Sequence, residues 1–200
     1  MKTIITIQHT QSVHHTNGMV GSWTDWDLTE LGISQAKRIG EKLKTELAGI
    51  KLRMYSSDLS RARQTAEYIG EYLGIKPELR SELRERNLGK CCGKPVQWLR
   101  DNIERQEKTI DDRMFSDAES RREEWNRLKP FFDEIMSNDE ETIIIVSHGD
   151  LLGVFNMMFT GSDAEALNAC EMHGSPGGVS FMVVNEGKRT IKRISDMSYI

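Results

Sequence analysis

The sequence predicts an α/β protein: a three-layer sandwich in which helices cover both faces of a mostly parallel central sheet. Two β-branched, apolar runs, residues 3–7 and 142–146, are typical of strands that are buried on both faces. Segments whose apolar residues recur at helical spacing alternate with these runs. This alternation favours a mostly parallel sheet. We expect residues 1–200 to form a single domain, because no composition break or repeat divides them.

The first half of the chain is expected to contain two strands and two helices. The strand at 3–7 leads into a polar turn, and residues 16–27 are expected to form a loop. A threonine that suits the N-cap, followed by apolar residues at helical spacing, predicts a helix over 29–47. Residues 52–56 form a second predicted strand. A 3-4-3-4 apolar repeat then predicts a helix over 57–73.

The second half is less regular at first and then resumes the α/β pattern. Residues 101–124 are the most polar part of the chain, and we expect a lid-like excursion over about 94–124. Apolar periodicity and β-branched runs predict the remaining elements: a weak strand at 79–83, helices at 98–108, 125–136 and 149–158, and strands at 142–146, 179–184 and 190–194, the last two joined by a hairpin turn at 185–187.

Composition and cysteine use limit the class of protein. The 27 Lys and Arg residues against 31 Asp and Glu leave a net charge of −4, so nothing favours a nucleic-acid partner. The apolar runs are too short to cross a bilayer, and the first residues do not resemble a signal peptide. Three cysteines, Cys91, Cys92 and Cys170, make no disulfide framework. We therefore expect a cytoplasmic protein with no membrane contact, and a vicinal redox pair at Cys91–Cys92 stays a minor alternative.

Two histidines follow predicted strands, and an arginine begins a predicted helix. His9 follows the first strand and His148 follows the strand at 142–146. Ligands of open α/β sheets bind beyond the carboxyl ends of the strands. Arg61 lies in the first turns of its helix, where unpaired N–H groups already attract anions. Each residue alone has a plain structural explanation, as a loop histidine or a solvated charge, but together they indicate an anion site.

Four short motifs occur in order along the chain. Residues 8–12 read QHTQS, residues 55–66 read YSSDLSRARQTA, residues 83–89 read LRERNLG, and residues 146–149 read VSHG. Each motif is weak alone. In this order they resemble the histidine phosphatase superfamily, whose members are also called phosphoglycerate mutase-like proteins. The likeness extends over most of the chain and implies a phosphoglycerate mutase-like fold.

The resemblance also implies a reaction and roles for individual residues. His9 would take the phosphoryl group as phosphohistidine, and Glu85 would protonate the leaving oxygen. A neutral imidazole, with an ordinary pKa of ~6.5, is a competent nucleophile near pH 7. No cofactor and no metal is implied, and the partner would be a small phosphorylated substrate. The implied phosphate-binding residues are Gln8, Arg61, His148 and His15, and Ser12, Thr24, Gly149 and His173 are further candidates for substrate contacts.

The first motif departs from the family pattern. Gln8 replaces the family's arginine, Thr10 replaces a glycine and would narrow the approach to His9, and Gln11 replaces an acid. A hydrogen bond to a charged group contributes about 1.5–3 kcal/mol, so losing this one would slow the reaction roughly ten- to a hundredfold. We hypothesise that His14 or His15, on the same loop, partly restores the lost positive charge; the alternative is that both face solvent.

The leading hypothesis is a phosphomonoester hydrolase. Its main rival is a non-catalytic protein that binds a phosphorylated ligand, which the altered first motif favours. A phosphoglycerate-type mutase is less expected, because the chain lacks the longer insertions of that class. A metal-dependent hydrolase built on the histidines is also less expected, because they show no recognised ligand spacing. The sequence identifies neither the substrate nor the oligomeric state.

Overall fold

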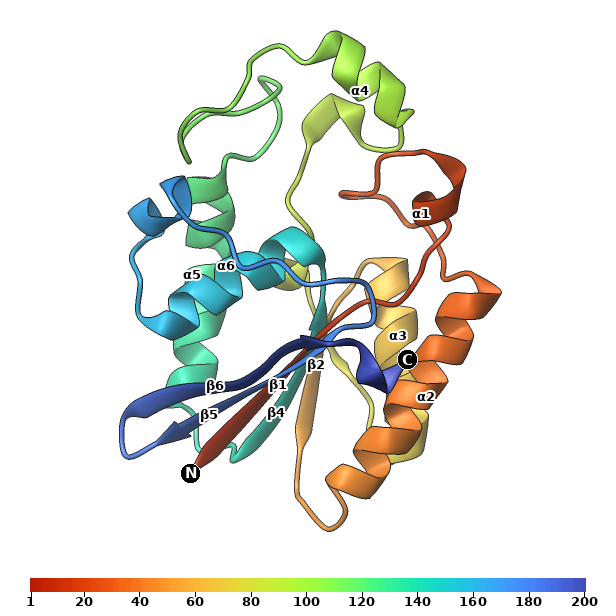
Figure 1. The fold of residues 1–200 in the computed structure, drawn as a ribbon, viewed down its shortest axis with the longest axis vertical. Helices are drawn as coiled ribbons and strands as arrows, with labels where there is room; N and C mark the ends of the chain where they lie inside the picture. Colours follow the sequence, from red (N-terminus) through yellow and green to blue (C-terminus); the bar gives the residue numbers. More distant parts are fainter.

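The computed structural model describes residues 1–200 and consists of a six-stranded sheet with helices on both faces (Figure 1). The strand order is β3-β2-β4-β1-β5-β6. The strands from β3 to β1 pair in parallel, whereas β5 is antiparallel to both β1 and β6. The predicted α/β sandwich with a mostly parallel sheet is confirmed. The strands are β1 (Lys2–Gln8), β2 (Arg53–Ser57), β3 (Glu78–Arg80), β4 (Thr142–Ser147), β5 (Val179–Asn185) and β6 (Lys188–Asp196).

Two apolar cores lie on opposite faces of the sheet, because successive residues of a strand point to opposite sides. In β4, Ile143 and Ile145 belong to the core beneath α5 and α6, whereas Ile144 and Val146 pack with α2 and α3. β4 is therefore apolar on both faces, as its sequence predicted. The helices are α1 (His14–Asn17), α2 (Glu30–Glu46), α3 (Ser60–Leu73), α4 (Val96–Asn102), α5 (Arg121–Ser137) and α6 (Gly149–Thr160).

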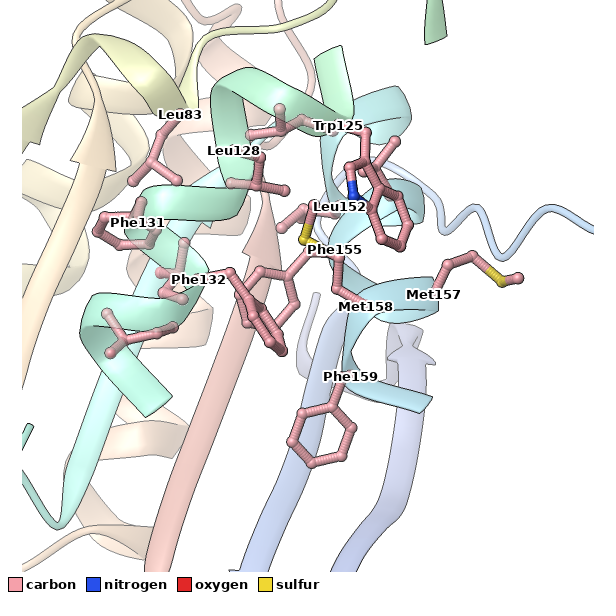
Figure 2. Close-up of a cluster of buried hydrophobic side chains, with 14 of the residues drawn as sticks. Leu83, Trp125, Leu128, Phe131, Phe132, Leu152, Phe155, Met157, Met158 and Phe159 are labelled. Atoms are coloured by element: carbon pink, nitrogen blue, oxygen red, sulfur yellow. The ribbon is translucent and has the colours of Figure 1, made fainter. Parts of the chain in front are cut away.

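Aromatic and aliphatic residues of α5 and α6 fill the larger core (Figure 2). The rings of Phe132 in α5 and Phe155 in α6 pack edge to face, with their centroids 5.3 Å apart. Removing a buried aromatic ring from such a core costs about 3–5 kcal/mol. This packing holds α6 in place, and α6 begins directly after β4. It therefore fixes the N-terminus of α6 at the carboxyl edge of the sheet.

The register of the central strands brings distant residues together. Gln8 pairs with Ser147 at the ends of β1 and β4. The residues that follow, His9 and His148, therefore leave the sheet side by side. β2 ends at Ser57, beside β4 at the same edge. In Figure 1 this edge is the one that faces α1 and α4.

Several element boundaries follow from capping and turn residues that are adjacent in the sequence. The predicted N-cap at Thr29 is confirmed, because its hydroxyl accepts a hydrogen bond from the Gly32 N–H. The helix predicted at 125–136 begins earlier, at Arg121, because Ser120 and Glu123 form a capping box. The SRRE pattern of that box is visible in the sequence and was the signal to use. The predicted hairpin at 185–187 is also confirmed.

Three other boundaries differ from the prediction. The helix predicted at 98–108 is the shorter α4, since the charged residues after Asn102 have nothing to bury and the Glu104 N–H instead bonds to the Met114 carbonyl. The weak strand predicted at 79–83 is β3, which turns into a 3₁₀ turn at Ser81–Leu83. One turn of helix, α1, begins just before the predicted loop at 16–27. No helix is both long and apolar enough to span a membrane.

The polar excursion at 94–124 has a small apolar cluster of its own. Phe115 and Ala118 pack there with Val20 and Cys91 from the body of the protein. Ion pairs fasten it further, from Lys90 to Glu104 and from Arg86 to Glu107. A lid-like movement of this excursion stays a prediction.

Candidate active site

Four residues that the motifs singled out converge beyond the carboxyl edge of the sheet. His9 follows β1, His148 follows β4, Arg61 lies in the first turn of α3, and Glu85 lies in the segment after β3. The ring centroids of His9 and His148 are 5.1 Å apart. The Arg61 guanidinium contacts His9, and the Glu85 carboxylate lies against the N-terminus of α6. The four motifs, which are separated in the sequence, thus meet at one place in the fold.

The hydrogen bonds of His9 define its protonation. Its Nδ1 lies 2.9 Å from the Thr10 carbonyl oxygen, which can only accept, so Nδ1 carries the proton. Its Nε2 accepts a hydrogen bond from Arg61 Nε at 3.1 Å. The side chain is buried, and burial together with the Arg61 charge lowers the pKa of His9 well below its ordinary value. His9 is therefore a neutral imidazole whose lone pair is on Nε2.

Backbone carbonyls orient Arg61. Its Nη1 donates to the Thr24 carbonyl and its Nη2 to the Ser22 carbonyl, both at 2.8 Å. Burial lowers the pKa of Arg61 to about 10, so the guanidinium is still cationic at pH 7. Thr24, a candidate for substrate contacts, thus lies at the site and holds Arg61 through its main chain. Sequence reasoning missed Ser22, because its contribution also comes from a carbonyl group and leaves no side-chain signature.

His148 has one nitrogen without a partner. Its Nε2 lies 2.8 Å from Ser57 Oγ, and its buried Nδ1 has no hydrogen bond. Ser57 Oγ accepts from the Leu59 N–H at 3.3 Å and has its own proton to donate. In the tautomer where that proton goes to His148 Nε2, the imidazole proton lies on Nδ1. A buried donor without an acceptor costs about 1–3 kcal/mol. In this tautomer the site offers an N–H to an acceptor such as a phosphoryl oxygen.

Ser57 was not among the predicted site residues. Its position at the carboxyl end of β2 was the available signal, because that edge is where ligands of α/β sheets bind.

Glu85 is held by main-chain N–H groups. Its Oε1 accepts from the Arg86 and Leu151 N–H groups at 3.1 and 3.2 Å. Burial, with a further contribution from the Asp150 charge, raises the pKa of Glu85 to about 7. A carboxyl group with this pKa is protonated in a large fraction of molecules near pH 7. It can therefore donate a proton and later accept one.

His14 and His15 lie beside His9, in surroundings that lower the pKa values of both rings. The Ser12 N–H donates to His15 Nδ1 at 3.2 Å, and His14 Nδ1 lies 2.6 Å from Ser12 Oγ. Burial lowers the pKa of His14 to about 3 and also lowers that of His15. These shifts favour the neutral form of both rings, which does not support the hypothesis that one of them restores a positive charge. Because its Nδ1 accepts, His15 carries its proton on Nε2 and offers a neutral donor.

The altered residues of the first motif occupy defined places. The Gln8 amide lies against Gly149, where a β-carbon would come within 3.2 Å of Gln8 Nε2, and Gln8 Oε1 is buried without a partner. Thr10 donates to the Gly32 carbonyl at 2.8 Å and contacts Thr65, between α2 and α3. Its side chain packs toward the helices, which does not support the expected narrowing at His9.

Two remaining groups lie outside the cluster of four. His173 packs over the first turn of α6 and contacts Glu171, with its Nε2 at 2.8 Å from a carboxylate oxygen. It is exposed at the rim and does not contact His9. All three cysteines are free thiols, and Cys92 Sγ donates to Ser22 Oγ at 3.2 Å while Cys91 is buried.

Comparison with known proteins identifies the family. The model of the histidine phosphatase superfamily (branch 1) matches residues 4–197, so the chain belongs to this superfamily. "Putative phosphoserine phosphatase 2" of Hydrogenobacter thermophilus is 25% identical over 100% of this chain and 98% of its own. The 2,3-bisphosphoglycerate-dependent phosphoglycerate mutase of Bartonella bacilliformis is 31% identical over 83% of this chain and 85% of its own.

Solved structures show the same fold. Bacillus stearothermophilus YhfR superposes with a TM-score of 0.84 at 22% identity, covering 100% of this chain and 99% of its own. A mycobacterial glucosyl-3-phosphoglycerate phosphatase complexed with VO3 gives a TM-score of 0.83 at 20% identity, with 98% and 100% covered. The relatives are phosphatases and mutases of similar length. Chain length therefore does not separate the two classes, contrary to our expectation from the missing insertions.

Proposed function

We propose that the protein is a phosphomonoester hydrolase that works through a phosphohistidine on His9, with Glu85 as the proton donor. The observation that carries the proposal is the pair of bonds on His9. Thr10 accepts from Nδ1, and Arg61 approaches Nε2 to 3.1 Å. A neutral nucleophile is thereby aimed at the place where a fixed cation would hold a phosphoryl oxygen.

In the first step His9 Nε2 attacks phosphorus and the ester P–O bond breaks. Glu85 gives its proton to the leaving oxygen, so the products are an alcohol and phosphohistidine. In the second step the Glu85 carboxylate takes a proton from water as that water attacks phosphorus. The P–N bond breaks, and phosphate leaves. Both steps use one group alternately as acid and base, which suits a pKa of about 7.

The phosphoryl oxygens would be held by donors of different kinds. Arg61 supplies the cation, His148 supplies the unpartnered Nδ1–H, and His15 supplies Nε2–H. Gln8 contributes only an amide. Positioning and charge stabilisation supply most of the rate in phosphoryl transfer, so a set with one cation supports catalysis that is slower than with two.

The test is a metal-free assay with p-nitrophenyl phosphate and a panel of phosphorylated metabolites that includes phosphoserine and 3-phosphoglycerate. We expect hydrolysis that is lost in His9→Ala and unaffected by EDTA. Acid-labile phosphate should be trapped on the wild-type protein and not on His9→Ala. Turnover that survives in His9→Ala would overturn the mechanism. Isomerisation of 3-phosphoglycerate without net phosphate release would identify a mutase instead.

A second candidate function is non-catalytic binding of a phosphorylated ligand. The buried, uncharged Gln8 amide favours it, because a phosphate pocket with one cation binds without strongly activating the ester. Retention of Glu85 with a raised pKa opposes it, since binding an anion needs no acid. Binding of inorganic phosphate by calorimetry, with no turnover of any ester in the panel, would favour this function.

A further inference from the structure

The turn after β1 brings three imidazole rings, those of His9, His14 and His15, close together, which the phosphatase reaction does not require. One nitrogen from each of His9, His14 and His15 lies within 4.8 Å of the other two. The ring centroid of His9 is 5.9 Å from that of His14 and 5.4 Å from that of His15. Nitrogens bound to tetrahedral zinc at about 2.0–2.1 Å lie about 3.4 Å from one another. Small side-chain movements would therefore bring all three around one ion.

We propose that His9, His14 and His15 bind a single divalent transition-metal ion of the zinc class, and that this ion inhibits the enzyme by occupying the nucleophilic nitrogen. The inhibitory part rests on the proposed function. The metal-binding part does not, because it depends only on the three imidazoles.

Two of the rings are already oriented as metal ligands are. His9 Nδ1 donates to the Thr10 carbonyl at 2.9 Å, and His14 Nδ1 lies 2.6 Å from Ser12 Oγ. Metal-binding histidines use their second nitrogen in this way, which fixes the ring and leaves the other nitrogen for the ion. Three neutral nitrogens suit Zn²⁺, Cu²⁺ or Ni²⁺ rather than Mg²⁺ or Ca²⁺, which prefer oxygen. A fourth position would remain for water.

Two contacts oppose the ion and limit its affinity. Arg61 Nε donates to His9 Nε2 at 3.1 Å, so the ion has to displace this bond and to tolerate a nearby guanidinium. The Ser12 N–H donates to His15 Nδ1, so the proton of that ring lies on Nε2. To bind the ion, the ring has to turn and present Nδ1, or its proton has to move from Nε2 to Nδ1; either change breaks the bond from Ser12. His15 is exposed and can do so. These costs favour a reversible site over a permanently held catalytic metal.

Competition with substrate follows from the shared atom. A metal ion on His9 Nε2 and a phosphoryl group attacked by the same nitrogen exclude each other. Zn²⁺ should therefore raise KM for p-nitrophenyl phosphate and leave kcat unchanged, with full reversal by EDTA.

Direct binding is tested with Co²⁺, whose visible spectrum reports its coordination, and with Zn²⁺ by calorimetry. The protein carries Cys92→Ser and Cys170→Ser to remove the accessible thiols. We expect one equivalent to bind, and at least tenfold weaker binding in either His14→Gln or His15→Asn. His173→Gln is the matched control, because His173 lies outside the cluster, and it should bind Co²⁺ as tightly as the parent.

The inhibition arm measures each variant against its own metal-free rate. His15→Asn should need at least tenfold more Zn²⁺ for half-inhibition than the parent. Absence of Co²⁺ binding, or binding in His14→Gln and His15→Asn as tight as in the parent, would overturn the metal site. Zn²⁺ inhibition that lowers kcat without raising KM would overturn the competitive mechanism. Co²⁺ binding without ester turnover would leave the metal site standing and reject the proposed function.

Discussion

The histidine side and the carboxyl side of the site respond to burial in opposite ways. Burial and the Arg61 charge lower the pKa values of His9 and His148, whereas burial and the Asp150 charge raise the pKa of Glu85 to about 7. The cause is the same, because a buried group favours its neutral form. Neutral means deprotonated for an imidazole and protonated for a carboxyl group. One environment thus prepares a nucleophile and an acid for the same pH.

The largest expected effect comes from removing the acid. Glu85→Gln keeps the shape of the side chain and its acceptor oxygen but cannot donate the proton, so kcat should fall by about 10²–10⁴. The loss should be greater for an alkyl phosphate than for p-nitrophenyl phosphate, whose leaving group needs less protonation. Steady-state kinetics on both substrates measure it. An equal loss on the two would contradict the role of Glu85 as proton donor.

Restoring the missing cation at position 8 should strengthen the binding of the phosphoryl group on the histidine side of the site. Gln8→Arg should raise kcat/KM roughly ten- to a hundredfold, because a charge-assisted hydrogen bond contributes about 1.5–3 kcal/mol. Gln8→Leu, which fills the space without donors, is the matched control and should lower kcat/KM. If Gln8→Arg and Gln8→Leu both lower it, the amide has a role that a cation does not replace.

The pH profile tests the carboxyl side. The rate should fall as the pH rises through about 7, because Glu85 then loses its proton. Asp150→Asn removes a charge that raises this pKa, so the alkaline limb should move to lower pH and the rate at pH 7 should fall a few-fold. Asp139→Asn, an exposed acid distant from the site, should leave the limb in place. A shift of the limb to higher pH in Asp150→Asn would refute the assignment.

Stability should show the same opposition between imidazole and carboxyl groups. Glu124 of α5 is fully buried, and burial raises its pKa to about 8, so the folded state binds more protons than the unfolded state between the ordinary value near 4.5 and about 8. The free energy of unfolding should therefore fall as pH rises through this window. The lowered pKa values of His9 and His148 have the opposite sign and reduce stability as pH falls below about 6.5.

Glu124→Gln should flatten the alkaline side of that stability curve and leave the acidic side. Urea unfolding at a series of pH values measures both sides. Glu134→Gln, a substitution of an exposed acid on the same helix, provides the control. An unchanged alkaline slope in Glu124→Gln would show that another group carries it.

Local patterns were sufficient wherever structure depends on neighbours in the chain. The β-branched run of β4 and the N-cap at Thr29 were read correctly, because strand burial and helix capping follow from adjacent residues. The helix expected to continue to residue 108 failed for a related reason: charged residues were assigned a helix without an apolar face to bury. The motifs also named His9, Arg61, Glu85 and His148, and the structure brings these four together.

The remaining properties of the site depend on segments that are distant in sequence. The sequence by itself determined which residues could react and the α/β class. Only the tertiary structure decided that β1 lies beside β4, that Ser57 bonds to His148, and that burial lowers the pKa of His15. The physical reason is that protonation and hydrogen bonding depend on burial and on partners that other segments supply. A motif names the imidazole, but its surroundings determine where its proton lies.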